Sequence, residues 1–168
     1  AFPELAHAED EPFLPRPDML ERQAEQARAL GFDGPYIALS VGAASFSKRP
    51  GIGLMVELAK RAKAAGFGCV LLGGAMNDTE RAQAVREHAP WALDITMPMG
   101  LAQRAAWIVK ASAVLAGDTG LGHLAAAAAV PTVVLFGPTR PSEFAPQGRN
   151  LRIQRKEDLD CLECGLHV

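Results

Sequence analysis

The fold is decided by residues 113–139, which read AVLAGDTGLGHLAAAAAVPTVVLFGPT. Two short apolar runs, 113–116 and 132–136, predict buried strands, and the alanine-rich stretch between them predicts a helix. Gly120 and Gly122 stand at the start of that helix, where each costs about 1 kcal/mol relative to alanine. A glycine-rich turn lets a ligand approach the backbone, and the first N–H groups of the helix attract an anion. This stretch therefore predicts a phosphate-binding turn between two strands.

Short apolar strands alternate with helices along the rest of the chain. Helices are predicted over residues 18–30, 52–65, 79–87, 101–111 and 120–129. Strands are predicted over residues 36–41, 69–72, 93–96, 113–116, 132–136 and 151–153. This alternation is typical of a doubly wound α/β fold, in which helices cover both faces of a parallel sheet. The first helix is expected to turn an apolar stripe toward the core, made of Leu20, Ala24, Ala27 and Leu30.

Length and composition fit one globular domain. The chain has 168 residues, of which 49% are hydrophobic, and a formal net charge of -2. We expect an extended lead-in over residues 1–16 and one Rossmann-like domain over 17–168. Acidic and basic residues are interleaved, which gives no electrostatic footprint for nucleic acid. No apolar run is long enough to be a transmembrane segment, so we expect a cytoplasmic protein.

Ligands of doubly wound sheets bind at the carboxyl ends of the strands, where the strand order reverses. Ser40 and Gly42 lie at the end of the first predicted strand, and Lys48 follows in the same loop. A solvated loop lysine is the common alternative, but Lys48 comes after the first strand and opposite the Asp118 turn. We therefore predict that Lys48 faces the crevice and neutralises a diphosphate.

The second predicted strand ends at Gly73 and Gly74, directly before another helix. Asp78 or Thr79 would cap this helix, and Glu80 suits its first turn because of the helix dipole. Either acid could instead accept hydrogen bonds from a ribose.

Met97 follows the third strand and is a candidate for contact with a purine face. Ordinary packing in the core is the alternative for a methionine at this place.

The turn after the fourth strand carries the strongest signal, in the residues Asp118, Thr119, Gly120, Leu121, Gly122 and His123. A capped helix start would explain the aspartate and the alanines, but not two glycines and a histidine in the first turn. A binding role is therefore favoured for these residues.

Cys161 and Cys164 have the spacing of half a zinc or redox site. Because the chain holds no second pair, we predict a structural role or half of a site completed elsewhere, and no metal site.

With these motifs in order, the chain resembles glycosyltransferase family 9, the ADP-heptose:lipopolysaccharide heptosyltransferases. The resemblance covers roughly residues 36–164. It rests on Gly42-Ala43 with Lys48-Arg49, on Leu71-Leu72-Gly73-Gly74 with Glu80, on Gly117-Asp118-Thr119-Gly120-Leu121-Gly122-His123-Leu124-Ala125-Ala126-Ala127, on Leu135-Phe136-Gly137-Pro138-Thr139 with Pro141 and Pro146, and on the cysteines Cys161 and Cys164. One departure is Lys48-Arg49-Pro50, where the family often has a tryptophan before the proline.

The resemblance implies the C-terminal, nucleotide-sugar-binding half of a GT-B fold. By position, Lys48 would contact the donor phosphates, Glu80 the ribose and the region of Met97 the adenine. The segment 118–123 would hold the diphosphate and the sugar. The general base would lie in the N-terminal GT-B domain, so Lys48 and Asp118 would have supporting catalytic roles.

The implied reaction is sugar transfer from ADP-heptose to a lipid-linked oligosaccharide acceptor of the lipopolysaccharide core. Fixed N–H donors and a lysine can replace a cation, so no metal cofactor is expected. A cytoplasmic location follows, and a peripheral position at the inner membrane stays open. The alternatives are a non-catalytic nucleotide-binding module and a GT-B-fold sugar-nucleotide epimerase domain.

Overall fold

The computed structural model describes residues 12–74, 78–158 and 162. Six parallel strands form one sheet: β1 (Tyr36–Ser40), β2 (Gly68–Leu72), β3 (Leu93–Ile95), β4 (Ala113–Gly117), β5 (Thr132–Phe136) and β6 (Leu151–Arg155). Their order across the sheet is β3-β2-β1-β4-β5-β6. The order reverses between β1 and β4, which confirms the Rossmann-like doubly wound fold.

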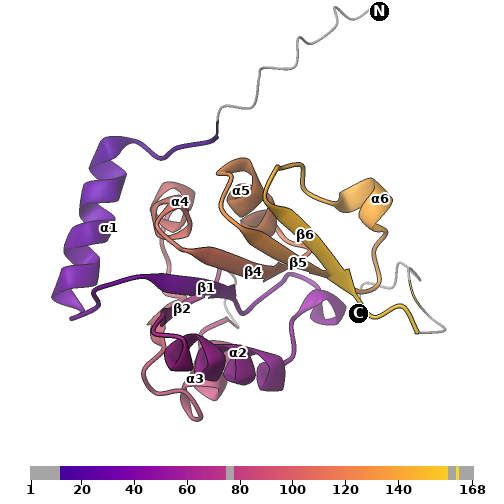
Figure 1. Ribbon diagram of the computed structural model, residues 1–168, viewed down its shortest axis with the longest axis horizontal. Helices are drawn as coiled ribbons and strands as arrows, with labels where there is room; N and C mark the ends of the chain where they lie inside the picture. The colour runs from indigo at the N-terminus through magenta and orange to yellow at the C-terminus, as the bar shows by residue number, and fades with distance from the viewer. Residues whose placement is uncertain (1–11, 75–77, 159–161, 163–168) are drawn as a thin grey trace, which may run out of the picture.

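Helices cover both faces of this sheet (Figure 1). One face packs against α2 (Ile52–Ala64) and α3 (Asp78–Arg86), and the other against α4 (Leu101–Val109) and α5 (Gly120–Ala127). The first helix, α1 (Pro17–Ala29), lies outside the sheet layer and packs on α4. Two short helices, η1 (Phe46–Lys48) and α6 (Pro141–Phe144), follow β1 and β5.

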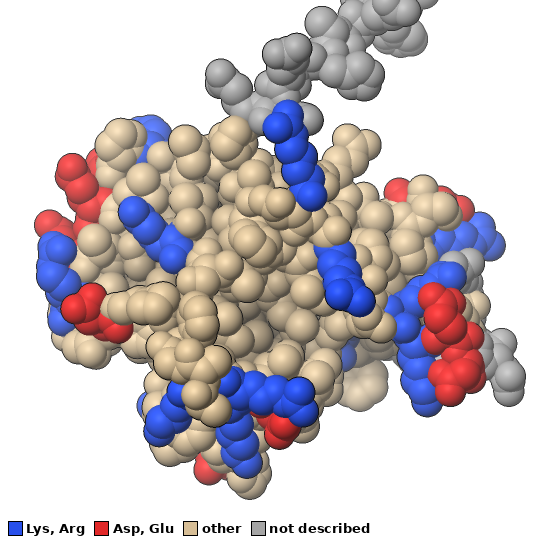
Figure 2. All heavy atoms as spheres, viewed as in Figure 1, with Lys and Arg blue, Asp and Glu red and all other residues tan. Residues whose placement is uncertain are grey.

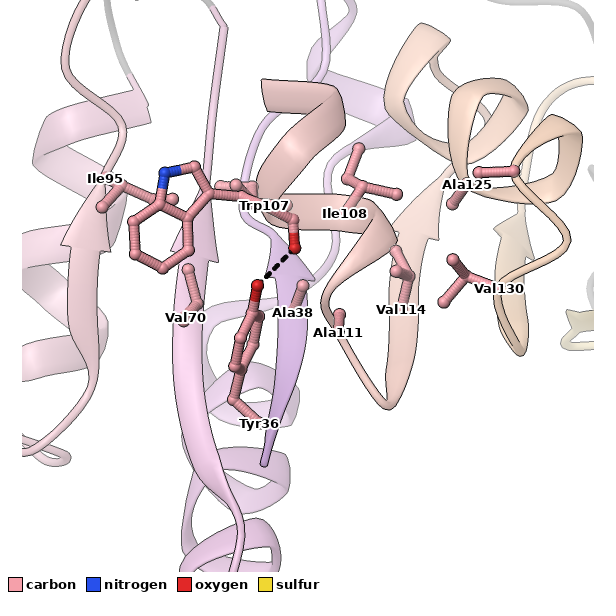
Figure 3. Packing of buried hydrophobic residues seen from close by; sticks show 12 residues of the cluster. Tyr36, Ala38, Val70, Ile95, Trp107, Ile108, Ala111, Val114, Ala125 and Val130 are labelled. Carbon is pink, nitrogen blue, oxygen red and sulfur yellow. Dashed lines mark hydrogen bonds between the residues drawn. The ribbon is translucent and has the colours of Figure 1, made fainter. Parts of the chain in front are cut away.

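The core on the α4 side is organised around two large aromatic side chains (Figure 3). Trp107 of α4 is fully buried, and its carbonyl oxygen accepts a hydrogen bond of 2.6 Å from the hydroxyl of Tyr36. Val70 and Ile95 lie beside them on β2 and β3. A buried hydroxyl needs such a partner, so this bond joins the first strand to α4 without leaving a polar group unpaired.

The strands begin and end within two residues of the ranges predicted from the sequence. The ends of the five predicted helices also lie within two residues of the observed ones. Gly31 and Gly66 follow the C-cap residues of α1 and α2 and adopt positive φ values of 64° and 81°. The short helices η1 and α6 were not predicted, since three or four residues show no periodicity.

The apolar stripe expected on the first helix is confirmed only in part. Leu20, Ala24 and Ala27 are half-buried, and Ala27 packs against the core. Leu30 lies past the end of α1 and is 51% exposed, whereas Met19 and Gln23 are buried. The reason is that α1 packs on α4, where Gln26 accepts a 3.4 Å hydrogen bond from Nε1 of Trp107. The buried face of α1 therefore carries polar glutamines.

The surface carries no single dominant charge. In the view of Figure 2, basic and acidic side chains form small groups that uncharged surface separates. None of the helices in the described ranges has both the length and the apolar content that a bilayer crossing requires. Residues 12–16 of the lead-in form neither helix nor strand, and the N–H of Phe13 donates to the Ala127 carbonyl at the end of α5.

Candidate functional site

A cavity of about 990 Å³ opens at the carboxyl edge of the sheet, at the reversal point between β1 and β4. The loop after β1 contributes Ser40, Gly42, Ala43, Ala44, Ser45 and Lys48. The turn after β4 and helix α5 contribute Asp118, Thr119, Gly120, Leu121, His123, Leu124 and Ala127. The remaining wall comes from Gly74, Asp78, Leu101 and Arg104. A cavity of this size is in the range of small-molecule and cofactor sites.

Asp118 organises one end of the cavity. Its Oδ2 accepts hydrogen bonds from Nζ of Lys48 at 2.7 Å and from Oγ1 of Thr139 at 2.8 Å. Nε2 of His123 lies 3.9 Å from Asp118 Oδ1. The Asp118 side chain is only 6% exposed and that of Lys48 18%, so this ion pair is poorly screened by solvent. The short helix η1, the turn after β4 and the turn after β5 thus meet at one carboxylate.

The N-terminus of α5 faces the same end of the cavity. Thr119 occupies the N-cap position, but no side chain of the described residues forms a capping hydrogen bond there. Its Oγ1 is buried and has no hydrogen-bond partner within the described residues. The first turn of a helix also leaves backbone N–H groups without intrahelical partners. These donors lie where a bound anion would satisfy them.

Two glycines make room for the Asp78 side chain. A Cβ at Gly42 would overlap the Asp78 carboxylate, and a Cβ at Gly73 would lie 2.6 Å from Cβ of Asp78. The N–H of Gly74 donates a 2.7 Å hydrogen bond to Asp78 Oδ2. Asp78 is 2% exposed and therefore lies buried between the two strand-end loops.

Arg81 joins the loop after β1 to the start of α2. Its Nε donates to the carbonyl of Val41 at 2.6 Å, and its guanidinium also bonds the carbonyl of Pro50. Burial is the main cause that lowers the pKa of Arg81, and the neighbouring Arg49 lowers it further. Arg81 thereby fixes the segment that carries Lys48.

Arg104 projects from α4 into the cavity wall beside Gly74. Its guanidinium carbon lies 3.7 Å from the position that a Cβ on Gly74 would take. The Nε of Arg104 is buried and has no hydrogen-bond partner among the residues with described positions.

The structure brings most of the predicted site residues together. Those that line the cavity are Ser40, Gly42, Lys48, Gly74, Asp118, Thr119, Gly120, Leu121 and His123. Gly122 is buried instead, and a Cβ there would lie 3.2 Å from the carbonyl of Gly117 on β4, so this glycine serves close packing of α5 on the sheet. Gly73, Glu80 and Met97 do not line the cavity; Glu80 is exposed on α3 and Met97 is 54% exposed.

Sequence reasoning missed Arg104 and the hydrophobic wall of Leu101 and Leu124. Arg104 lies on a helix with solvent-facing polar positions, where nothing in the sequence separates a wall residue from a surface one. Asp78, one of two acids left open for a ribose, is the one that lines the cavity.

Cys161 and Cys164 lie outside the described residues. Within the ranges that are described, no three His, Cys, Asp or Glu side chains gather closely enough to hold a metal ion. The side chains that line the cavity and can donate hydrogen bonds are those of Ser40, Ser45, Lys48, Arg104, Thr119 and His123. Such a set suits a phosphorylated ligand.

Known proteins share this sequence pattern and this fold. The model of glycosyltransferase family 9 (heptosyltransferase) matches residues 6–165, so the chain belongs to this family. It is 35% identical to lipopolysaccharide heptosyltransferase 1 of Pseudomonas aeruginosa over 130 residues, which cover 77% of this chain and 36% of that protein. The chain thus spans about a third of the length of this curated relative.

Solved structures share the fold. The ADP-heptose lipopolysaccharide heptosyltransferase II of Escherichia coli superposes with a TM-score of 0.76 at 24% identity, over 89% of this chain and 46% of that one. An E. coli heptosyltransferase solved with ADP gives a TM-score of 0.68 at 24% identity, over 77% of this chain and 47% of that one.

Proposed function

We propose that this chain is the donor-binding part of a glycosyltransferase that transfers heptose from ADP-heptose to a lipopolysaccharide-core acceptor. The family and the names of its relatives support the reaction class. One E. coli protein of similar fold is an ADP-heptose lipopolysaccharide heptosyltransferase, and another E. coli heptosyltransferase was solved with ADP, which supports the choice of nucleotide. Such an acceptor would place the protein in the cytoplasm, at or near the inner membrane.

The observation that carries the proposal is the set of unsatisfied donors at one end of the cavity. The Thr119 hydroxyl is buried without a partner in the described structure, and the α5 N-terminus has no side-chain cap. A diphosphate there would accept hydrogen bonds from these groups and lie beside Lys48. Buried polar groups in folded proteins usually have a hydrogen-bond partner, and a ligand phosphate would supply one here.

The proposed chemistry is displacement at the anomeric carbon with inversion. The acceptor oxygen attacks as its proton leaves to a base, and the bond to the diphosphate breaks, so negative charge grows on the leaving phosphate oxygen. The α5 N–H groups, the Thr119 hydroxyl and Lys48 are placed to stabilise that charge without a metal. Asp118 holds Lys48 in position through the 2.7 Å ion pair.

The base is proposed to come from a part of the protein outside this chain, in the N-terminal GT-B domain. Both carboxylates of the cavity already accept bonds from protein donors: Asp118 from Lys48 and Thr139, and Asp78 from the Gly74 N–H. Both carboxylates thus serve as acceptors for protein donors, and we assign the acceptor's proton to a base outside this chain. Loss of a positioned base alone removes a factor of about 10²–10⁴ in rate.

The test combines a binding and a transfer measurement on the 168-residue chain. We expect calorimetry to show ADP binding, and an assay with ADP-heptose and a lipopolysaccharide-core acceptor to show no turnover by the chain alone. Transfer by this chain would contradict the assignment of the base to another domain. Absence of ADP binding at millimolar concentration would contradict the donor-binding role.

A further inference from the structure

We propose that Arg104 binds the nucleoside part of the donor nucleotide, an inference that rests on the donor-binding function proposed above. Arg104 is the fourth residue of α4, and its side chain forms part of the cavity wall. A buried Nε without a partner among the described residues is a costly arrangement in a folded protein. A ligand acceptor in the cavity would remove this cost.

Arg104 differs from the other cation that lines the cavity. Lys48, the other cation of the wall, already forms an ion pair with Asp118. Arg104 forms neither a hydrogen bond nor an ion pair with any residue whose position is described. A guanidinium has donors only, in a planar fork, so it recognises acceptor atoms or stacks on a ring.

Position decides which part of the nucleotide Arg104 meets. The diphosphate is assigned to the α5 N-terminus and Lys48, at the end of the cavity formed after β4. Arg104 lies at the other wall, beside Gly74, whose N–H donates to Asp78. In doubly wound sheets an acid after the second strand accepts hydrogen bonds from a ribose. Asp78 follows β2, so the ribose of the bound nucleotide would lie at this wall. The base attached to that ribose would then come within reach of Arg104.

Adenine carries ring nitrogens that accept hydrogen bonds, and its flat face suits a guanidinium plane. We therefore assign Arg104 a contact with the base. The neighbouring Leu101, which is 63% exposed and also lines the cavity, adds an apolar surface for the same ring.

The experiment compares ADP with inorganic pyrophosphate, which has no nucleoside, by calorimetry on the full chain. Arg104→Met should weaken ADP about tenfold, the equivalent of one hydrogen bond from a charged donor, and change pyrophosphate affinity less than about twofold. The control, Arg86→Met, removes the same charge from an exposed position on α3 outside the cavity and should change neither.

Arg104→Lys is the second variant, because it keeps the charge but loses the planar fork. It should weaken ADP by at least about threefold, again without an effect on pyrophosphate. Equal losses for ADP and pyrophosphate would overturn the assignment to the nucleoside, and unchanged ADP affinity in folded variants would overturn the role of Arg104. If the unmodified chain binds no ADP, the donor-binding function itself fails, and this inference falls with it.

Discussion

At the scale of single residues, the carboxylate of Asp118 determines where the cation of the site stands. It accepts from Lys48 and Thr139 through the same oxygen, Oδ2. The two donors have different surroundings, because Lys48 lines the cavity and Thr139 does not. Variants that remove the Lys48 or the Thr139 donor one at a time can therefore distinguish a role in ligand binding from a role in holding Asp118.

Lys48→Met and Thr139→Val form a matched pair. Lys48→Met should weaken ADP by about tenfold or more, since a phosphate loses its positioned counter-charge. Thr139→Val should cost about 1.5–3 kcal/mol of unfolding free energy, the value of a hydrogen bond to a charged group, and leave ADP affinity within about twofold. Calorimetry and urea unfolding measure the two effects. Equal ADP losses in both variants would show that Lys48 acts only by holding Asp118.

The sequence predicted those residues of the candidate site that lie in the segments directly after predicted strands. Lys48, Asp118 and Thr119 lie at predicted strand ends and do line the cavity. Glu80 does not line it, because a helix turns successive side chains by about 100° and only Asp78, two positions earlier, faces the cavity. Arg104 could not be predicted, since its role depends on the packing of α4 against the loop after β2.

At the scale of elements, the junction between the loop after β1 and helix α3 sets the shape of the site. Arg81 bonds the carbonyl of Val41, and Gly42 lies against the buried Asp78 carboxylate. This junction requires the absence of a side chain at residue 42. The requirement comes from the protein itself and holds with or without a ligand.

Gly42→Ala should therefore destabilise the fold by about 1–3 kcal/mol, the usual cost of an added group in a packed site. Gly53→Ala is the control: Gly53 lies in α2 with nothing within 4 Å of its Cβ position. This change should stabilise by up to about 1 kcal/mol, because alanine favours a helix. Thermal and urea unfolding give both values. A neutral Gly42→Ala variant would mean that Asp78 can move away.

The elements themselves were largely predictable. Short strand patterns of three to six residues, separated by helical periodicity, predict the sheet, and the structure confirms all six strands. The orientation of α1 was not predictable, because its buried residues are Met19 and the polar Gln23, and its partner, Trp107, is distant in sequence. Hydrophobic periodicity does not give the order of the strands across the sheet either. That order follows from the general rules of doubly wound sheets.

At the scale of the whole molecule, two buried groups should make the stability of the fold decrease at alkaline pH. Burial raises the pKa of the Cys69 thiol to about 12, and burial also raises the pKa of the Tyr36 hydroxyl. In the unfolded chain the pKa of a cysteine thiol is about 8.5. Stability is therefore complete below that pH and falls as the pH rises toward the folded pKa.

The slope between about pH 8.5 and 10 should approach about 1.4 kcal/mol per pH unit, because one proton separates the two states. Urea unfolding at a series of pH values measures it. Cys69→Ala should be less stable at pH 7, since it leaves a small cavity, but should lose less stability between pH 8.5 and 10. Parallel slopes in the two proteins would show that Cys69 is not the group responsible.

The most direct test of the donor site is an ADP titration followed by amide NMR on the 168-residue chain. The predicted result is saturable shifts in the loop around Gly42 and Lys48, at Gly74, and over Asp118–Leu124, where the cavity lies. These segments are far apart in sequence and meet only at the carboxyl edge of the sheet. Shifts centred on α1 and α4 around Met19 and Trp107, where a second and smaller pocket lies, or no shifts at millimolar ADP, would contradict the account.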